Sequence, residues 1–262
     1  MSDIVGTQDG AILRIELNRP QKKNALTSEM YITIAELLNG AQSNPEVRVV
    51  LIHSSGDVFS AGNDLQDFID HPPGTGDGPQ KKLIDALSRL DIPLVAAVRG
   101  AAVGSGATML SYCDFVYVGE SSKFQYPFIN LAVVPEFGTS FSLPEQVGYL
   151  RAAEVILLGH PFDATVAQSM GLVTKVLPDS EVFEVAVRTS NELAQKPAGA
   201  LQASKQLMRR QIRPHVEQAV QAELVEFSEK VRSAEAREAF AAFFEKRPPR
   251  FNTSASPPAH SE

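Results

Sequence analysis

The sequence contains one cysteine, no tryptophan and no long apolar run. A single cysteine, Cys113, excludes an intrachain disulfide and a zinc site of the CxxC type, so we expect it to be a small buried core residue. No stretch approaches the roughly 18 apolar residues of a membrane span, and the N-terminus lacks the basic start and apolar run of a secretory signal. The last three residues do not match the Ser-Lys-Leu peroxisomal address. We therefore expect a soluble, cytoplasmic protein with no membrane partner.

Positive charge is also scarce, with 24 Lys and Arg against 31 Asp and Glu and a formal net charge of −7. This charge repels a nucleic-acid backbone, so we expect no nucleic-acid partner. The tightest basic cluster, Arg209, Arg210 and Arg213, is expected to be a solvated helix face. The histidines are scattered and no glycine pattern matches a dinucleotide fingerprint, so we expect neither a metal nor a redox cofactor.

The 262 residues, 44% of them hydrophobic, suffice for one large domain with an appendage. Residues 11–17 alternate between apolar and polar side chains, which predicts an outer strand with one wet face. Residues 47–53 and 93–98 are apolar runs without alternation, as expected of strands buried on both faces. Helical stretches lie between them, so the predicted fold class is α/β.

Helix signals fill the intervals between these strands. Residues 27–30 form a plausible helix start, and residues 83–90 carry a leucine stripe at helical spacing. A third helix is expected to open at residues 104–106 and run through Leu110. Residues 71–79 have neither periodicity nor core material, which predicts a mobile loop that can lie over a site.

The composition changes to helix formers near Leu201. We therefore divide the chain into an α/β core at residues 1–200 and a C-terminal helical region at residues 201–262. Phe240, Phe243 and Phe244 give this region an apolar side that should pack on the main body or on another subunit. Residues 252–258 are expected to fray.

Two short glycine-bearing segments each follow a β-like run. They are residues 59–65 (Phe-Ser-Ala-Gly-Asn-Asp-Leu) and residues 100–106 (Gly-Ala-Ala-Val-Gly-Ser-Gly). Backbone N–H groups at such strand-to-helix turns can stabilise one developing oxyanion, as an acyl thioester forms when it becomes enolate-like. A plainer interpretation is also open, because the glycines can serve only tight turns and close packing, and Asn63 or Asp64 can simply cap the next helix.

Four segments in order resemble one superfamily. Asn-Arg-Pro at 18–20 with Asn-Ala-Leu at 24–26, then residues 59–65, 93–100 and 244–247, are similar to the enoyl-CoA hydratase/isomerase (crotonase) superfamily over residues 10–251. The resemblance implies a crotonase-like spiral of ββα units and a C-terminal helical trimerisation region, in a homotrimer or a dimer of trimers. It implies an acyl-CoA substrate, so coenzyme A is part of the substrate and no separate cofactor is expected.

The resemblance also implies roles for single positions. The backbone N–H groups of Asn63 and Ser105 are the expected oxyanion donors for the thioester oxygen. The expected substrate- and CoA-binding positions are Ala25, Ala61, Asp64, Leu65 and Lys246, although Lys246 can also be a plain surface charge.

Hydratases of this superfamily use two glutamates, and both positions differ here. The first position is occupied by Thr108 and the second by Phe128. A hydroxyl has too high a pKa to act as a base at neutral pH, and a phenyl ring carries no proton. Ordinary hydratase activity is therefore not expected.

One glutamate, Glu136, is the only acidic residue between Lys123 and Leu143. Its segment resembles the Pro-Glu-Gly region of peroxisomal-type Δ3,Δ2-enoyl-CoA isomerases, whose single catalytic glutamate lies there. One base can remove a proton from C2 and return it to C4, so we predict a Δ3,Δ2-enoyl-CoA isomerase with Glu136 as proton shuttle and a pKa raised by burial. Phe137 stands where a glycine is usual, and its bulk is expected to narrow the acyl channel or change the chain length accepted.

Alternatives remain at each level. Glu136 can be a first-turn residue that complements a helix dipole. The same oxyanion hole suits thioester hydrolysis, decarboxylation, dienoyl isomerisation or a hydratase-like reaction, and the chain can also be a non-catalytic CoA-ester-binding protein. Among other residues, we expect His53 to be structural, His71 to be solvated, Asp67 with Asp70 to form an acidic surface, and Tyr126 to lie at the acyl pocket or in the core.

Overall fold

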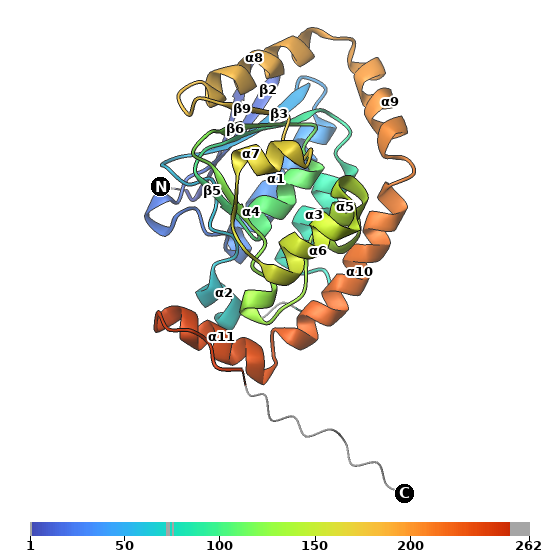
Figure 1. Ribbon diagram of the computed structural model, residues 1–262. Coiled ribbons are helices and arrows are strands. Elements are labelled where there is room, and N and C mark those ends of the chain that lie inside the picture. The colour runs from blue at the N-terminus through green and yellow to red at the C-terminus, as the bar shows by residue number, and fades with distance from the viewer. Residues whose placement is uncertain (1, 72–73, 75, 252–262) are drawn as a thin grey trace, which may run out of the picture.

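The computed structural model describes residues 2–71, 74 and 76–251 and has two β-sheets surrounded by helices (Figure 1). The larger sheet has the strand order β1-β2-β3-β4-β6-β9, in which β1 is antiparallel to β2 and the other pairs are parallel. Its strands are β1 Ile4–Asp9, β2 Ile12–Leu17, β3 Val49–Ser54, β4 Leu94–Val98, β6 Phe115–Gly119 and β9 Lys175–Leu177. The smaller sheet consists of β5 Ala101–Val103, β7 Lys123–Gln125 and β8 Phe162–Asp163.

The predicted buried strands are confirmed. The strand predicted at the sheet edge exists but is the second strand from the edge. β3 and β4 are almost wholly buried, as their unbroken apolar runs indicate. The strand expected at residues 11–17 is β2, but the sheet edge is β1, which the sequence prediction missed. β1 carries only a short apolar start before mostly exposed residues, so its hydrophobic pattern is weak.

The two sheets are linked in a repeating way that confirms the spiral of strand pairs and helices. β4 in the large sheet leads to β5 in the small one, and β6 likewise leads to β7. After β3, Ser60 forms a parallel bridge with Ala102 of β5, which continues the same arrangement. The segments that follow β3, β4 and β6 therefore lie next to one another, at or beside the small sheet.

Helices occupy most of the intervals between the strands and the C-terminal region as far as Phe244. They are α1 Ser28–Ser43, α2 Leu65–Asp70, α3 Pro79–Arg89, α4 Ser105–Thr108, α5 Thr139–Val147, α6 Tyr149–Leu158, α7 Ala164–Ser169, α8 Val182–Gln195, α9 Ala198–Arg209, α10 Arg213–Lys230 and α11 Ala234–Phe244. Short 3-10 turns are η1 Pro20–Lys22, η2 Met109–Tyr112 and η3 Ile129–Leu131.

Local signals explain where several helices begin. The Thr27 side chain accepts a hydrogen bond from the Met30 N–H at 3.3 Å, so the predicted start of α1 is confirmed. The third expected helix is α4 and continues as the 3-10 turn η2. In the expected loop at 71–79, residues 72, 73 and 75 lie outside the described residues, and α3 begins at Pro79, a favoured first helical position.

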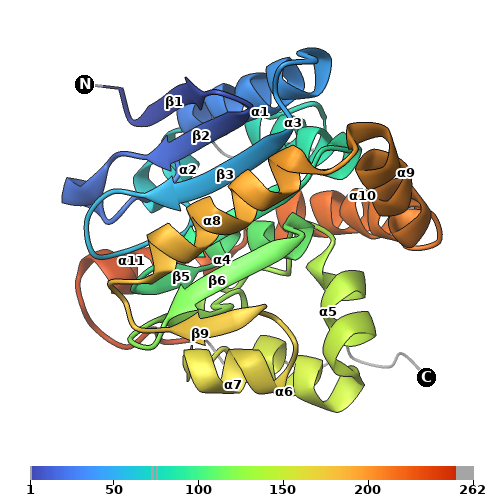
Figure 2. The same ribbon diagram turned by 90° about the horizontal axis from the view of Figure 1, so that it is seen from above.

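Two apolar cores lie on opposite faces of the large sheet. α8 lies across one face, whereas α1 and α3 cover the other (Figure 2). The smaller core joins α8 to side chains such as Val49, Leu51 and Val95. The larger core, on the other face, extends to α10 and α11, so the C-terminal helices are part of the main body.

The C-terminal helices run along one side of the molecule (Figure 1), and α11 lines the same cavity as α2. A domain boundary at residue 200 falls inside α9, which begins at Ala198. The buried Lys205 donates to the Ile92 carbonyl at 2.8 Å and to Asp114 at 2.6 Å, which fixes α9 on the core. On α11, Phe240 is buried, but Phe243 is 60% exposed.

The prediction of a solvated arginine face is wrong for two of its three members. Arg209 donates to the Tyr112 carbonyl and Arg213 pairs with Asp91 at 3.0 Å, because the start of α10 and the end of α9 lie against the body. Arg210 is exposed. The expected frayed segment 252–258 lies outside the described residues. In the part of the chain that the structure describes, no helix is both long and apolar enough to cross a membrane.

Candidate active site

The two glycine-bearing turns lie against each other, as the sequence predicts. Ser60 N–H donates to the Ala101 carbonyl and Val103 N–H donates to the Ser60 carbonyl, each at 3.0 Å. Gly62 has φ +85°, and a Cβ there would lie 2.7 Å from the Val103 oxygen. A side chain at Gly62 would therefore separate the turns, which explains the glycine by close approach as well as by conformation.

Each turn carries one backbone N–H that the fold leaves free. Among the described residues, neither the Asn63 N–H nor the Ser105 N–H donates to a protein acceptor. Ser105 is the first residue of α4, where an N–H has no partner within the helix. Ser105 is fully buried and Asn63 partly buried, and N–H groups inside a protein are nearly always paired, so two free ones in adjacent turns are suited to an anionic ligand atom.

The side chains of the same two residues hold Glu136. The Ser105 hydroxyl donates to Glu136 Oε1 at 2.6 Å, and the Asn63 amide donates to Oε2 at 3.2 Å. The Gln80 amide, from the first turn of α3, also donates to Oε2 at 2.6 Å. Glu136 is only 4% exposed. Burial raises the pKa of Glu136, while the hydrogen bonds from Ser105, Gln80 and Asn63 oppose that rise.

A tyrosine orients the amide of Asn63. The Tyr31 hydroxyl, from α1, donates to Asn63 Oδ1, so the Asn63 NH₂ group points to Glu136. Burial and then the charge of Glu136 raise the pKa of Tyr31, which keeps its hydroxyl protonated and donating. The sequence prediction missed both Tyr31 and Gln80. Neither belongs to a motif, and Gln80 is 56 positions from the carboxylate that it contacts.

A cavity of about 580 Å³ opens beside this carboxylate. Six of the predicted site residues line it, namely Ala25, Ala61, Asn63, Asp64, Leu65 and Glu136. Ser105 is fully buried and is not among the described lining residues, whereas its neighbour Gly104 is. Lys246 is exposed and is not among the described lining residues; its neighbour Arg247 is, together with Lys22 and Lys23. Much of the wall is apolar and comes from η3, α10 and α11 with residues such as Leu131, Phe227 and Phe240.

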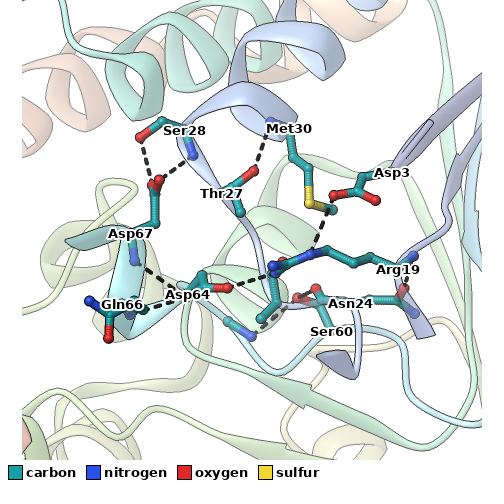
Figure 3. Close-up of polar contacts among 12 residues, drawn as sticks. Asp3, Arg19, Asn24, Thr27, Ser28, Met30, Ser60, Asp64, Gln66 and Asp67 are labelled. Carbon is teal, nitrogen blue, oxygen red and sulfur yellow. Dashed lines mark hydrogen bonds and ion pairs between the residues drawn. The ribbon is translucent and has the colours of Figure 1, made fainter. Parts of the chain in front are cut away.

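The side chain of Asp64 stabilises the structure beside the cavity. It caps α2 by accepting from the N–H groups of Gln66 and Asp67, and it pairs with Arg19 at 2.7 Å (Figure 3). Burial opposes its ionisation, but the hydrogen bond from Arg19 and those from the two N–H groups lower its pKa. The capping alternative is therefore correct for Asp64, although the residue also borders the cavity.

Asp67 is not part of a plain acidic surface, contrary to the prediction. Its carboxylate accepts from the Ser28 N–H at 2.8 Å and from the Ser28 hydroxyl at 2.7 Å (Figure 3). It therefore ties α2 to the start of α1, where a negative charge is favourable. Asp70 is exposed and accepts a hydrogen bond from Gln66 on its own helix.

The two hydratase positions hold no acid within reach of the cavity. Thr108 is buried, its hydroxyl has no partner among the described residues, and it does not line the described cavity wall. Phe128 does line the cavity, but its phenyl side chain carries no acid. Glu136 is thus the buried carboxylate with a raised pKa on this wall, because the pKa of Asp64 is lowered by its partners.

Phe137 lines a small cavity with Glu136 rather than the large one, which favours a packing role over the expected narrowing of the acyl channel. The described lining of the large cavity does not include it. Its ring is 1% exposed and packs between the rings of Tyr31 and Tyr112, each with a centroid separation of 6.4 Å. Its backbone has φ +61°, a left-handed conformation that costs a bulky residue about 1 kcal/mol or more. The left-handed turn directs the side chain into the core.

Replacing this ring tests its role. We expect Phe137→Gly to destabilise the fold by about 2–4 kcal/mol, because the lost packing of a buried phenyl exceeds the relieved strain. The preference among acyl chain lengths should stay unchanged, because Phe137 lies outside the described lining of the large cavity. Denaturant unfolding and turnover of a chain-length series measure the two effects. A shift in chain-length preference with native stability would contradict the assignment.

The remaining titratable residues lie in structural places. His53 packs edge-to-face on Phe183 with ring centroids 4.9 Å apart, as expected of a structural residue, and His71 is largely solvated. Tyr126 stacks on Phe162 in the core, which decides between its two predicted positions. Cys113 is half-buried and packs against the larger core, so it is less buried than predicted.

Comparisons with known proteins agree with the geometry. The family model described as enoyl-CoA hydratase/isomerase matches residues 7–254. The chain is 36% identical over 214 residues to rat enoyl-CoA delta isomerase 2, covering 79% of the chain and 54% of the relative. It thus spans about half the length of this relative. It is also 30% identical over 252 residues to 2,3-dehydroadipyl-CoA hydratase of Escherichia coli, covering 96% of the chain and 99% of the relative.

The solved structures give the same result. An enoyl-CoA hydratase/isomerase structure from Pseudoalteromonas atlantica superposes with a TM-score of 0.91 at 37% identity. The match covers 96% of this chain and all of that one. With the crotonase fold, the paired turns and the family match in agreement, the chain belongs to the enoyl-CoA hydratase/isomerase family.

Proposed function

We propose that the chain is a Δ3,Δ2-enoyl-CoA isomerase in which Glu136 moves one proton between two carbons of the acyl chain. The observation that carries the proposal is one arrangement of three residues. Asn63 and Ser105 each have a free backbone N–H, and their side chains hold the carboxylate of Glu136 at the same place. A base and an oxyanion site are thereby built from the same two turns.

The chemistry follows from this arrangement. Glu136 takes a proton from C2, so the C2–H bond breaks, an O–H bond forms on the carboxylate, and the electron pair moves into the thioester. The N–H groups of Asn63 and Ser105 stabilise the resulting oxyanion, each contributing about 3 kcal/mol. Glu136 then returns the proton to C4, and the double bond lies between C2 and C3. No water enters the product.

The hydrogen-bond partners of Glu136 fit a shuttle. The NH₂ groups of Gln80 and Asn63 that face Glu136 can only donate, so they favour the ionised carboxylate. The hydroxyl of Ser105 can also accept, so it can pair with the protonated form after the first transfer. Burial raises the pKa of Glu136 and therefore makes it a stronger base than an exposed glutamate.

The thioester and pantetheine are proposed to follow Ala25, Ala61, Asp64 and Leu65 along the cavity wall. Cations at its edge suit the phosphates of coenzyme A in a chain whose net charge is −7. Arg247 is already paired with Glu238 at 2.6 Å. We therefore assign the phosphates to Lys22 and Lys23 on the wall, with Lys246 outside it.

A homotrimer, alone or paired into a dimer of trimers, is the proposed assembly, and the cytoplasm is the proposed location. The C-terminal helices leave apolar side chains in water, including Leu207 at 67%, Met208 at 71% and Ile212 at 43% exposure. Such a surface favours association with other copies.

The test of the function is a substrate comparison with the purified protein. We expect conversion of 3-enoyl-CoA to 2-enoyl-CoA, and no hydration of 2-enoyl-CoA, because Thr108 and Phe128 supply no second acid. Chromatography of the CoA esters after incubation with 3-enoyl-, 2-enoyl- and dienoyl-CoA distinguishes the reactions. Formation of 3-hydroxyacyl-CoA, free CoA or no product would contradict the proposal.

A further inference from the structure

The turn that carries Glu136 has an unusual backbone. Phe137 and Gly138 both adopt left-handed conformations, with φ of +61° and +71°. Gly138 is also the residue that precedes α5, and it has no side chain to cap the free N–H groups of that helix. The free N–H groups at the start of α5 therefore need an acceptor from another part of the chain. Such an acceptor also fixes the turn that carries Glu136.

A carboxylate from the C-terminal region does so. Glu223 on α10 accepts from the Gly138 N–H at 2.6 Å and from the Ser140 N–H at 2.7 Å. It is 6% exposed and lies 85 positions from Gly138. Burial raises the pKa of Glu223, while its contacts to Ser140 and Gly138 oppose the rise. The position at a helix N-terminus also favours a carboxylate.

A second hydrogen bond fixes the same turn through the carbonyl of Phe137. The Tyr112 hydroxyl donates to the Phe137 carbonyl at 2.9 Å. The residue after Glu136 is therefore fixed through its carbonyl by Tyr112, and the next residue through its N–H by Glu223. The two contacts come from different elements, η2 and α10, and neither touches the cavity wall described above.

We propose that Glu223 is a positioning residue for Glu136. Its carboxylate fixes the left-handed turn that aims the Glu136 carboxylate at Ser105, Asn63 and the cavity. This inference rests on the proposed function, because Glu136 is the base there. It gives α10 a part in the reaction, through a residue that does not touch the substrate.

Charge adds a second effect. The titratable groups that face Glu136 are Tyr31 from α1 and Glu223 from α10, and the other contacts come from Ser105, Gln80 and Asn63, which do not titrate. Glu136 and Glu223 line one small cavity. The charge of Glu136 raises the pKa of Glu223, and the same repulsion acts on Glu136 whenever Glu223 is ionised.

The test compares Glu223→Gln with Glu226→Gln, an exposed glutamate on the same helix. The two N–H groups bind different oxygens of Glu223, so in the first variant one of them faces an NH₂ group, which cannot accept. We expect its kcat for 3-enoyl-CoA to fall about 10- to 100-fold, while KM and the affinity for a saturated acyl-CoA stay within about twofold. The acidic limb of its pH profile should move to lower pH. The control should behave as the native protein.

Glu223→Asp separates position from charge. It keeps the charge but shortens the reach, so we expect kcat to fall and the acidic limb to stay in place. It is also the variant measured if thermal unfolding shows that Glu223→Gln does not fold. Native kcat in a folded Glu223→Gln or, if that variant does not fold, in Glu223→Asp would overturn the inference.

If the proposed isomerase function is wrong, the native protein does not convert 3-enoyl-CoA at all, and this result differs from a failure of the positioning role. In that case crystal structures of the native protein and Glu223→Gln test the positioning role alone. We expect the Glu136 carboxylate to leave Ser105 Oγ in the variant. An unmoved carboxylate would overturn the inference.

Discussion

Glu136→Gln is expected to lower kcat for 3-enoyl-CoA isomerisation by about 10²- to 10⁴-fold, the range that a positioned general base contributes. The amide has nearly the same shape as the carboxylate but accepts no proton at neutral pH. Its oxygen can still accept from Ser105 or Gln80, so the site should remain folded. Formation of the conjugated 2-enoyl thioester measures the loss.

The matched control is Glu145→Gln, an exposed glutamate on α5, the helix that follows Glu136. It should keep native activity, and both variants should bind a saturated acyl-CoA as the native protein does. Native turnover in Glu136→Gln would exclude the shuttle and favour another base or another reaction. Loss of acyl-CoA binding as well would assign Glu136 to substrate binding.

The pH dependence gives an independent check on the same residue. Glu136 must be ionised to accept the C2 proton, so kcat/KM should fall as the pH drops through its pKa. Burial raises that pKa above the value of an exposed glutamate, and the three donors oppose the rise. The acidic limb should therefore lie at higher pH than a solvated glutamate would place it, and it should vanish from any residual activity of Glu136→Gln.

Much of this site could be predicted because its parts are local. The buried runs that became β3 and β4 each precede a glycine-bearing turn, and a turn is specified by neighbouring residues. Glu136 was identifiable because its segment resembles the Pro-Glu-Gly region of the isomerases and no other acid lies between Lys123 and Leu143. The pairing of the two turns followed from the topology, since consecutive parallel strands end at the same edge of a sheet.

The rest depends on contacts between distant segments. Gln80, Tyr31 and Glu223 come from three helices and converge on one turn, and no pattern around any of them indicates this. The direction of Phe137 depended on one backbone dihedral angle, which the sequence does not reveal for a residue that is not glycine. Arg209 and Arg213 were misjudged because the docking of α9 and α10 on the body, not their own charge, decides their partners.

Ser105→Pro is expected to remove one oxyanion donor and to lower kcat by about 10²- to 10³-fold beyond the loss of the hydroxyl. Proline suits this position because Ser105 is the first residue of α4, where its fixed φ is favoured. Gly104 precedes it and has no Cβ to clash with the ring. The substitution therefore deletes an N–H that has no protein acceptor to lose.

Ser105→Ala separates the hydroxyl from the N–H. It removes the hydrogen bond to Glu136 Oε1, worth about 1–1.5 kcal/mol, so kcat should fall about tenfold while the oxyanion donor remains. Thermal unfolding establishes that both variants fold before their rates are compared. If a folded Ser105→Pro matched Ser105→Ala, the N–H would play no part and the oxyanion would be bound elsewhere. A much lower rate in the proline variant would mean that Ser105 acts twice, holding the base through its side chain and the thioester oxygen through its backbone.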